Sequence, residues 1–211
     1  MKRVINLNNW NRKEHFKFFS ALDDPFWGIT TTVDFTSIYQ QSKNMEVSFF
    51  LYSVHFLLKC INATTAFKLR IENGEVVEYD KINISPTIGR EDGTFGFGFF
   101  EYDTDLSLFI ENAEKEIHRV KNSTGLSFSK DTARADVIRY SALPWFAFSE
   151  MKHAGSIQTG DSIPKISTGK LIQEKKKLLL PISISVHHGL VDGRNVAEFI
   201  QNVKDGQNNT L

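Results

Sequence analysis

Apolar and polar residues alternate strictly over residues 182–186, which read Ile-Ser-Ile-Ser-Val and follow an apolar run. Side chains along a strand point to opposite faces with a period of two, so this pattern predicts a β-strand with one apolar and one polar face. If the strand continues, His188 extends the apolar face and His187 the polar face. Gly189 and Gly193 then bracket a tight turn, because glycine reaches backbone angles that crowd other residues.

The rest of the chain alternates between strand-like and helix-like patterns. We expect strands at residues 28–36, 67–71, 76–79, 92–100, 138–145, 163–172 and 177–188, and helices at residues 12–22, 47–61, 105–120 and 194–203. The helix at 47–61 is apolar on almost every face, which predicts that it is buried. Asn73-Gly74 is a strong signal for a hairpin turn. Together these elements predict an α/β fold, a two-layer sandwich of a mixed β-sheet with helices packed on one face.

Length and charge narrow the class of protein. At 211 residues the chain has the length of one compact domain, and no linker or repeat divides residues 1–211. Its 25 basic and 25 acidic residues balance, which argues against nucleic-acid partners. There is no apolar signal core and no run near the roughly 20 apolar residues of a membrane span, so we expect a cytoplasmic protein without a membrane partner. The single cysteine, Cys60, agrees with a reducing compartment.

The chain also contains 18 phenylalanines, more than a single core of this size needs. They can simply fill the core. An oligomer interface or an aromatic substrate channel explains the composition equally well.

His188 is the candidate general base, because it lies where an apolar strand ends and a glycine-bracketed turn begins. A neutral imidazole with a pKa near ~6.5 suits proton transfer at neutral pH. A purely structural histidine is the alternative, and it is the commoner role for a lone residue of this kind. A catalytic triad with Asp192 is not required. We expect no metal, because adjacent histidines on a strand diverge and there is no cysteine cluster.

Several motifs carry a resemblance to a known family. They are His187-His188-x-x-x-Asp192-Gly193, the segment 10–16 that reads Trp-Asn-Arg-Lys-Glu-His-Phe, the hairpin segment 67–80, and Ser141-Ala-Leu-Pro-Trp145. In this order and at this spacing they resemble the chloramphenicol acetyltransferase family over nearly the whole chain. The first motif also occurs in the acyltransferase cores of 2-oxo acid dehydrogenases and in peptide-synthetase condensation domains. Condensation domains are much longer, however, and dehydrogenase cores usually carry swinging-arm domains.

The resemblance implies a homotrimer with active sites between its subunits and acetyl-CoA as co-substrate. It implies that His188 is the general base through Nε2, with Nδ1–H bonded to its own backbone carbonyl. Ser141 stands at the family's serine position and would stabilise the tetrahedral oxyanion, a role worth ~3–4 kcal/mol per donor. Asp192 would be structural and pair with Arg12 to fix the turn. Since the chain has no Gly-x-Ser-x-Gly elbow, we expect a substrate hydroxyl to attack the thioester directly.

For CoA, residues 164–170 (Pro-Lys-Ile-Ser-Thr-Gly-Lys) resemble a family segment. The resemblance makes Lys170 a candidate contact of the nucleotide phosphates and Ser167 the counterpart of the usual threonine. A solvated Lys170 fits the sequence equally well. Residues 45–48 (Met-Glu-Val-Ser) lack the family's phosphate-contacting lysine, and Lys43 lies close enough to substitute.

For the acceptor pocket, Phe19 and Trp27 are the candidate residues. Phe19 stands where the family has a tyrosine, which removes a hydroxyl that could bind substrate. The loop at 22–27 does not resemble the family's loop, and Asp23 and Asp24 are unexpected beside an apolar antibiotic.

The sequence therefore predicts a CoA-dependent acyltransferase that moves acetyl from acetyl-CoA to the hydroxyl of chloramphenicol and so confers antibiotic resistance. A small aromatic molecule with a hydroxyl group is the expected acceptor. Two alternatives stay open: the same chemistry on another hydroxyl or thiol acceptor, and a non-catalytic homologue that binds CoA or small aromatics. The intact set of His188, Ser141, Arg12 and Asp192 argues against the second.

Overall fold

The computed structural model describes residues 1–155 and 160–208. The helices are α1 (Lys13–Ser20), α2 (Thr36–Asn44), α3 (Phe49–Ala63), α4 (Leu106–Lys121) and α5 (Gly193–Asn208), with short 3-10 turns η1 (Leu7–Asn9) and η2 (Thr65–Lys68). The strands are β1 (Lys2–Val4), β2 (Phe26–Asp34), β3 (Leu69–Glu72), β4 (Glu75–Tyr79), β5 (Asn83–Gly89), β6 (Phe95–Phe97), β7 (Val137–Ala142), β8 (Lys165–Thr168), β9 (Ile172–Glu174) and β10 (Lys177–His187).

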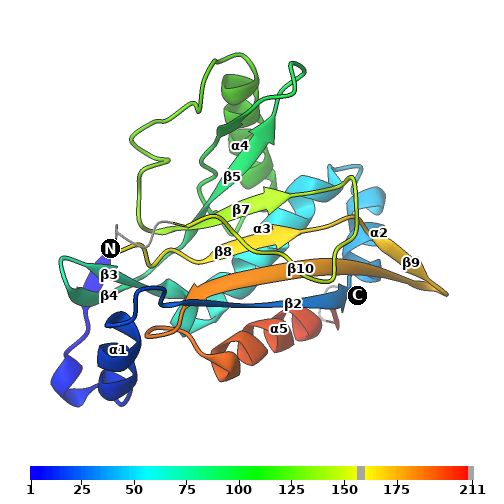
Figure 1. The fold of residues 1–211 in the computed structure, drawn as a ribbon. Coiled ribbons are helices and arrows are strands. Elements are labelled where there is room, and N and C mark those ends of the chain that lie inside the picture. The colour runs from blue at the N-terminus through cyan, green and yellow to red at the C-terminus, as the bar shows by residue number, and fades with distance from the viewer. Residues whose placement is uncertain (156–159, 209–211) are drawn as a thin grey trace.

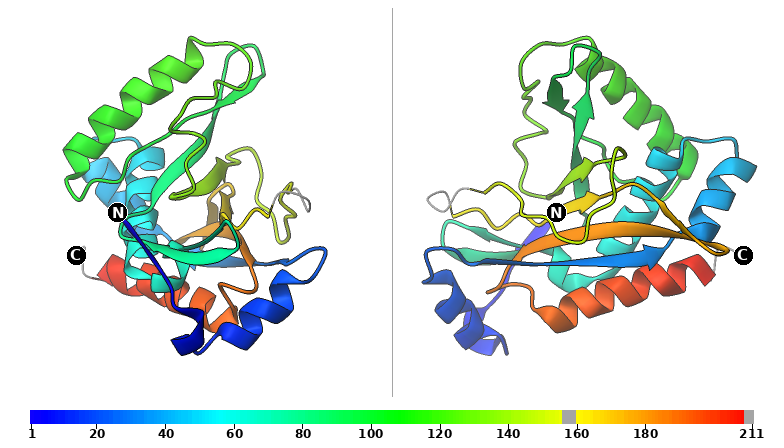
Figure 2. Two further views of the ribbon diagram at one scale, coloured as in Figure 1. Left: turned by 90° about the vertical axis from the view of Figure 1, so that its left-hand side faces the viewer. Right: turned by 45° about the vertical axis from the view of Figure 1, so that its right-hand side comes forward.

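One mixed sheet organises the molecule. It has seven strands in the order β2-β10-β8-β7-β5-β6, with β9 paired to β10. Strands β5, β7 and β8 are parallel neighbours, and the other pairs are antiparallel. A separate three-stranded sheet contains β1, β4 and β3. Helices α3, α4 and α5 lie on one face of the large sheet (Figures 1 and 2), so the predicted two-layer α/β arrangement is confirmed.

The alternation at residues 182–186 divides the two faces of β10 as predicted. Ile182, Ile184 and Val186 are buried in the core with the helices. Ser185 and His187 line a pocket on the opposite face. The apolar helix predicted near residues 47–61 is α3, and most of its side chains are buried.

Several predicted strands are shorter than expected: the strand at 138–145 ends at Ala142, and the strand at 67–71 begins at Leu69. Of residues 92–100, only Phe95–Phe97 pairs as a strand, because Gly93 adopts a positive φ of 82° in the preceding turn and Gly98 bonds to the Pro86 carbonyl outside the ladder. The predicted strand at 163–172 is divided into β8 and β9. A Cβ atom at Gly96 would lie 2.5 Å from Ser127 Oγ, so a neighbouring segment packs closely against this glycine.

Candidate active site

The turn that carries His188 lies between the end of β10 and the start of α5. The His188 N–H donates to the Pro25 carbonyl at 2.8 Å, and the N–H groups of Leu190 and Val191 both donate to the His187 carbonyl at 3.0 Å. These bonds close the turn and tie it to the start of β2. Because β10 ends at His187, His188 belongs to the turn and not to the strand, which corrects the predicted range of 177–188.

The His188 ring packs flat against an aromatic side chain. It stacks on Phe19 with ring centroids 3.8 Å apart and planes 8° apart, and the Trp27 ring lies 5.4 Å away. Its Nδ1 atom is buried and has no hydrogen-bond partner among residues 1–155 and 160–208. The expected bond from Nδ1–H to the residue's own carbonyl is therefore missing. That carbonyl accepts from Arg12 Nη2 instead, at 3.4 Å.

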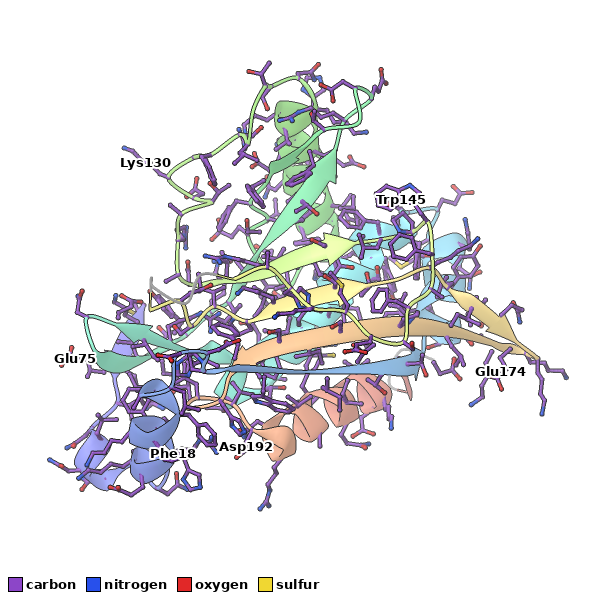
Figure 3. All side chains as sticks on the ribbon, viewed as in Figure 1. Phe18, Glu75, Lys130, Trp145, Glu174 and Asp192 are labelled. Atoms are coloured by element: carbon purple, nitrogen blue, oxygen red, sulfur yellow. The ribbon has the colours of Figure 1, made fainter. Side chains whose placement is uncertain are left out.

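An ion pair holds the amino-terminal segment against this turn. Arg12 Nη1 donates to Asp192 Oδ2, while Asp192 Oδ1 accepts from the N–H groups of Arg194 and Asn195 at 2.9 and 3.2 Å. Asp192, labelled in Figure 3, thus caps α5 with one oxygen and binds Arg12 with the other. Burial alone would raise the pKa of Asp192, but the hydrogen bonds from Arg12 and the helix N-terminus outweigh it and keep that pKa below its usual value.

His187 lies in different surroundings from His188. It is 4% exposed, and its Nδ1 accepts a hydrogen bond from the Gly189 N–H at 3.2 Å. Burial lowers the pKa of His187 to about 4; the charge of His188 acts in the same direction and that of Asp161 opposes it. His187 is therefore neutral at pH 7, and the bond from Gly189 makes it part of the turn's framework.

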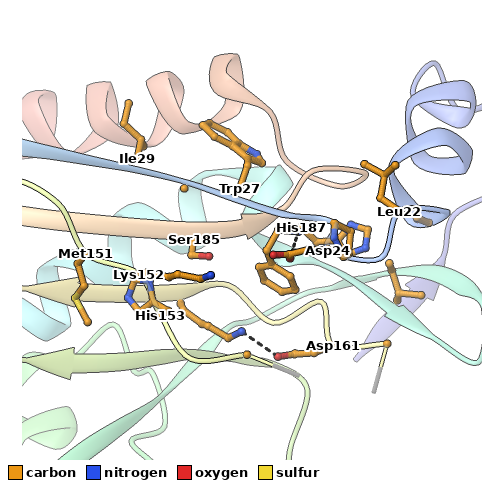
Figure 4. Close-up of a pocket in the computed structure, with 18 of the residues that line it drawn as sticks. Leu22, Asp24, Trp27, Ile29, Met151, Lys152, His153, Asp161, Ser185 and His187 are labelled. Atoms are coloured by element: carbon orange, nitrogen blue, oxygen red, sulfur yellow. Dashed lines mark hydrogen bonds and ion pairs between the residues drawn. The ribbon is translucent and has the colours of Figure 1, made fainter. Parts of the chain in front are cut away.

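A pocket of about 790 Å³ opens on the side of the sheet away from α3 and α5. Strands β2, β8 and β10 contribute to its lining, and so do residues 149–155 and Asp161 of the segment before β8 (Figure 4). Lys165, Ser185 and His187 come from the strands, and His153 comes from the preceding segment. A volume of this size suits a small molecule.

Hydroxyl groups form a row across the large sheet. Ser141 on β7 is in register with Ser167 on β8, and Ser167 is in register with Ser183 on β10. Thr87 Oγ1 donates to Ser141 Oγ at 3.2 Å, which leaves the Ser141 O–H to act as a donor. Ser167 is fully buried, and its Oγ lies 2.9 Å from His153 Nε2 in a hydrogen bond.

The candidate base and the candidate oxyanion donor lie far apart in one chain. Ser141 is two strands from Ser183 in the sheet, and His188 is five residues beyond Ser183 along β10 and its turn. With strands about 4.8 Å apart and a rise of about 3.3 Å per residue, His188 and Ser141 are roughly 19 Å apart. A single chain therefore does not bring them to the same reacting atoms.

The candidate CoA residues differ in exposure. Lys170 is exposed just after β8, and its N–H donates to the Phe146 carbonyl at 2.9 Å. Ser167 is fully buried. Lys43, considered above as a substitute phosphate contact, has its Nζ 5.3 Å from the centroid of the Tyr39 ring.

The candidate acceptor residues on the His188 side have structural contacts as well. Phe19 stacks on His188, and Trp27 Nε1 donates to the Val191 carbonyl at 2.9 Å. Asp24 Oδ1 accepts from the Phe26 N–H at 3.2 Å, which places Asp24 in the turn before β2.

An exposed aromatic cluster beside Ser141 escaped the sequence analysis. Phe97 is in register with Thr87, the hydrogen-bond partner of Ser141. Phe128 stacks on Phe97 with ring centroids 5.5 Å apart, and Phe95 meets Phe97 edge-on at 5.8 Å. Phe95 and Phe128 are 48% and 71% exposed. The alternating Phe-Gly-Phe of β6 is the signal that could have found two of these rings, because alternate residues share a face.

Among the described residues, no group of three or more His, Cys, Asp or Glu side chains could hold a metal ion. No helix in residues 1–155 or 160–208 is long and apolar enough to cross a membrane.

Sequence comparison finds relatives over nearly the whole chain. The family model described as chloramphenicol acetyltransferase matches residues 2–204. Chloramphenicol acetyltransferase 3 of Escherichia coli is 27% identical over 208 residues, which cover 98% of this chain and 97% of the relative. A chloramphenicol acetyltransferase of Clostridioides difficile is 28% identical, with coverages of 95% and 93%.

Structure comparison agrees. A solved chloramphenicol acetyltransferase is similar with a TM-score of 0.89 and 29% identity, and the match covers 98% of this chain and 99% of that one. A probable dihydrolipoamide acetyltransferase from Listeria monocytogenes has a TM-score of 0.69 at 13% identity, covering 99% and 94% of the two chains. The second likeness concerns the fold alone.

Removing either partner of the Arg12–Asp192 pair is expected to lower the free energy of unfolding by about 1–3 kcal/mol, measured by urea denaturation. The loss is smaller than for a fully buried pair, because the two side chains remain 17% and 32% exposed. Asp192→Ala should cost more than Arg12→Ala, since it also removes a helix cap. The double variant should lose less than the sum. Strictly additive losses would show that the pair does not interact, and Lys17→Ala, an exposed cation on α1, is the control.

Acidification from pH 7 to pH 5 is expected to destabilise the protein by about 1–2 kcal/mol through His187. Its pKa is about 4 when folded and ~6.5 when unfolded. Between these values the unfolded state binds more protons, so stability falls as pH falls. In His187→Gln the loss between pH 7 and pH 5, measured by urea denaturation, should shrink by this amount. His55 and His153, whose pKa values burial also lowers, affect both proteins alike; an identical pH dependence in the variant would contradict the assignment.

Proposed function

The chain belongs to the chloramphenicol acetyltransferase family, and we propose that it transfers the acetyl group of acetyl-CoA to a hydroxyl of chloramphenicol and thereby confers resistance to the antibiotic. The observation that carries this proposal is the family match over residues 2–204. The similar E. coli and C. difficile proteins bear the name of this activity. We further propose that residues 1–211 act as one domain in the cytoplasm.

In the proposed reaction, His188 Nε2 takes the proton of the acceptor hydroxyl while its oxygen attacks the thioester carbonyl. The Ser141 O–H donates to the tetrahedral oxyanion. Collapse of the intermediate breaks the C–S bond, and the proton passes from His188 to the sulfur, which gives an O-acetyl product and the CoA thiol. The stack on Phe19 and the bond from Arg12 to the His188 carbonyl support this role, because they fix the imidazole in one orientation.

The active sites in this proposal lie between subunits of a homotrimer. The separation of roughly 19 Å between His188 and Ser141 within one chain supports it, because the two can act on one acetyl group only if they come from different copies. The exposed rings of Phe95 and Phe128 beside Ser141 support it too, since large exposed aromatic clusters mark binding surfaces. In a three-fold ring, each subunit contributes its His188 to the site of one neighbour and receives the His188 of the other neighbour at its own Ser141.

In this proposal, different kinds of residue bind the two substrates: aromatic residues bind the acceptor and a lysine binds CoA. Phe97 and Phe128 would hold the aromatic ring of the acceptor beside Ser141, and Phe19 and Trp27 would border the His188 side. Lys170 is exposed and would contact the nucleotide phosphates of CoA. The Ser167 side chain is fully buried. It would therefore support CoA binding indirectly, through the row of hydroxyl groups that it shares with Ser141 and Ser183.

The proposal predicts thiol release when the purified protein is mixed with acetyl-CoA and chloramphenicol, with acetyl-chloramphenicol identified by mass. His188→Ala should lower kcat by ~10²–10⁴-fold, because it removes the general base. His187→Ala should retain much more activity than His188→Ala in folded protein. If the wild-type protein releases no thiol, the proposed function is refuted. If His187→Ala is inactive and His188→Ala is active, the roles of the two histidines are reversed.

Mixing two inactive variants tests the shared site. A His188→Ala chain co-refolded in equal amounts with a Ser141→Ala chain should regain activity, because about a quarter of the interfaces join an intact His188 to an intact Ser141. Each variant refolded alone is the control. Activity that stays at the level of the controls, or a monomeric mass in light scattering, would exclude a site shared between subunits.

A further inference from the structure

Lys165 is buried at the pocket, where a lysine is rarely found. Its side chain is 7% exposed, and its Nζ lies 3.3 Å from Asp161 Oδ2 and 4.3 Å from the centroid of the Phe26 ring. Figure 4 draws the ion pair to Asp161 as a dashed line. A Cβ atom at Gly155 would come within 3.0 Å of Nζ, so the segment before β8 leaves room for the ammonium group. A buried ammonium group needs charged or hydrogen-bonding partners, so the groups around Lys165 show what this part of the pocket can bind.

Asp161 does not by itself neutralise this ammonium group. The same Oδ2 atom lies 2.8 Å from Arg139 Nη1, so two cations share one carboxylate. The other carboxylates at the pocket, Asp24 and Glu150, are exposed to solvent, where water screens their charge. Lys165 therefore does not have the Asp161 carboxylate to itself, because the half-exposed Arg139 binds the same oxygen.

His153 supplies a second donor from the segment before β8. If the Ser167 O–H donates to Nε2 across their 2.9 Å contact, Nδ1 carries the ring proton. That Nδ1 atom is buried and has no hydrogen-bond partner in the part of the chain that the structure describes. Burial and the charge of Lys165 lower the pKa of His153, so the ring is neutral near pH 7. Lys165 and His153 thus line the same pocket.

We propose that Lys165 and His153 bind the carboxylate of a second class of acceptor. These acceptors are small compounds in which an aromatic ring carries a hydroxyl-bearing group at one end and a carboxylate at the opposite end. This inference rests on the proposed acetyl transfer to a hydroxyl. Chloramphenicol has no carboxylate and so offers no ionic partner to Lys165. The bond changes are the same as before: the hydroxyl oxygen gains the acetyl group, the C–S bond breaks, and the proton ends on the CoA sulfur.

The spacing in the sheet fits such a molecule. Ser141 is in register with Ser167, and Lys165 is two residues before Ser167 on the same face of β8. The strand spacing and rise put the Cα atoms of Ser141 and Lys165 roughly 8 Å apart. One benzene ring with a hydroxymethyl group at one end and a carboxylate at the other can bridge this distance.

A matched pair of acceptors tests the proposal: para-(hydroxymethyl)benzoate and its methyl ester, which share ring and hydroxyl and differ in charge. With purified wild-type protein and acetyl-CoA, kcat/KM from thiol release should be about 10- to 100-fold higher for the benzoate, the range expected from a charge-assisted hydrogen bond. In Lys165→Met the ratio of the two kcat/KM values should fall toward one, and Lys165→Arg should keep part of it. Asp161 remains paired with Arg139 in Lys165→Met, so the variant should fold, which thermal unfolding checks. Lys152→Met, an exposed lysine of the same pocket, controls for general charge effects.

The outcomes separate the two proposals. If chloramphenicol is acetylated and the ester is used as well as the benzoate or better, the carboxylate site is overturned and the proposed function stays intact. Thiol release with none of the three acceptors would overturn the proposed function itself. An equal fall of the ratio in Lys152→Met and Lys165→Met would also overturn the site, because the preference would then reflect surface charge. The wild-type comparison decides the matter even if Lys165→Met fails to fold.

Discussion

The position of the candidate base depends on one ion pair, formed by Arg12 and Asp192 across 180 positions of sequence. Asp192 caps α5 with its second oxygen, and Arg12 also donates to the His188 carbonyl. Helix α1, which begins just after Arg12, carries Phe19, the ring on which His188 stacks. The turn, α1 and α5 are therefore fixed to one another through these two side chains. The pair thus adds to the backbone bonds that close the turn and tie it to the start of β2.

The period of two in β10 explains how one sheet can serve two purposes. Its apolar side chains face the helices and close the core. Its alternate side chains face the pocket, where neither α3 nor α5 competes for them. The serines of β7, β8 and β10 share a register, so the hydroxyl row follows from the pairing of the strands.

Local pattern was enough to predict the sheet, the buried α3, the Asn73-Gly74 hairpin and the turn after β10, because each depends on neighbours in sequence. It was not enough for contacts between distant segments. Arg70 looks like an ordinary strand residue, yet it is fully buried and donates to the carbonyls of Phe67, Leu69, Ala135 and Val137, and burial lowers its pKa to about 10. The Lys165–Asp161–Arg139 group and the stacking of Phe97 on Phe128 were missed for the same reason.

Unsatisfied polar atoms mark the site independently of any family likeness. Among the described residues, the buried side-chain atoms without a hydrogen-bond partner are Arg12 Nε, His153 Nδ1 and His188 Nδ1. Leaving such an atom unpaired costs about 1–3 kcal/mol, so a folded chain keeps few of them. All three belong to the His188 turn or to the pocket, and none lies in the core among α2, α3 and α4. In the proposed trimer, a substrate or a second subunit would supply the missing partners and offset these costs.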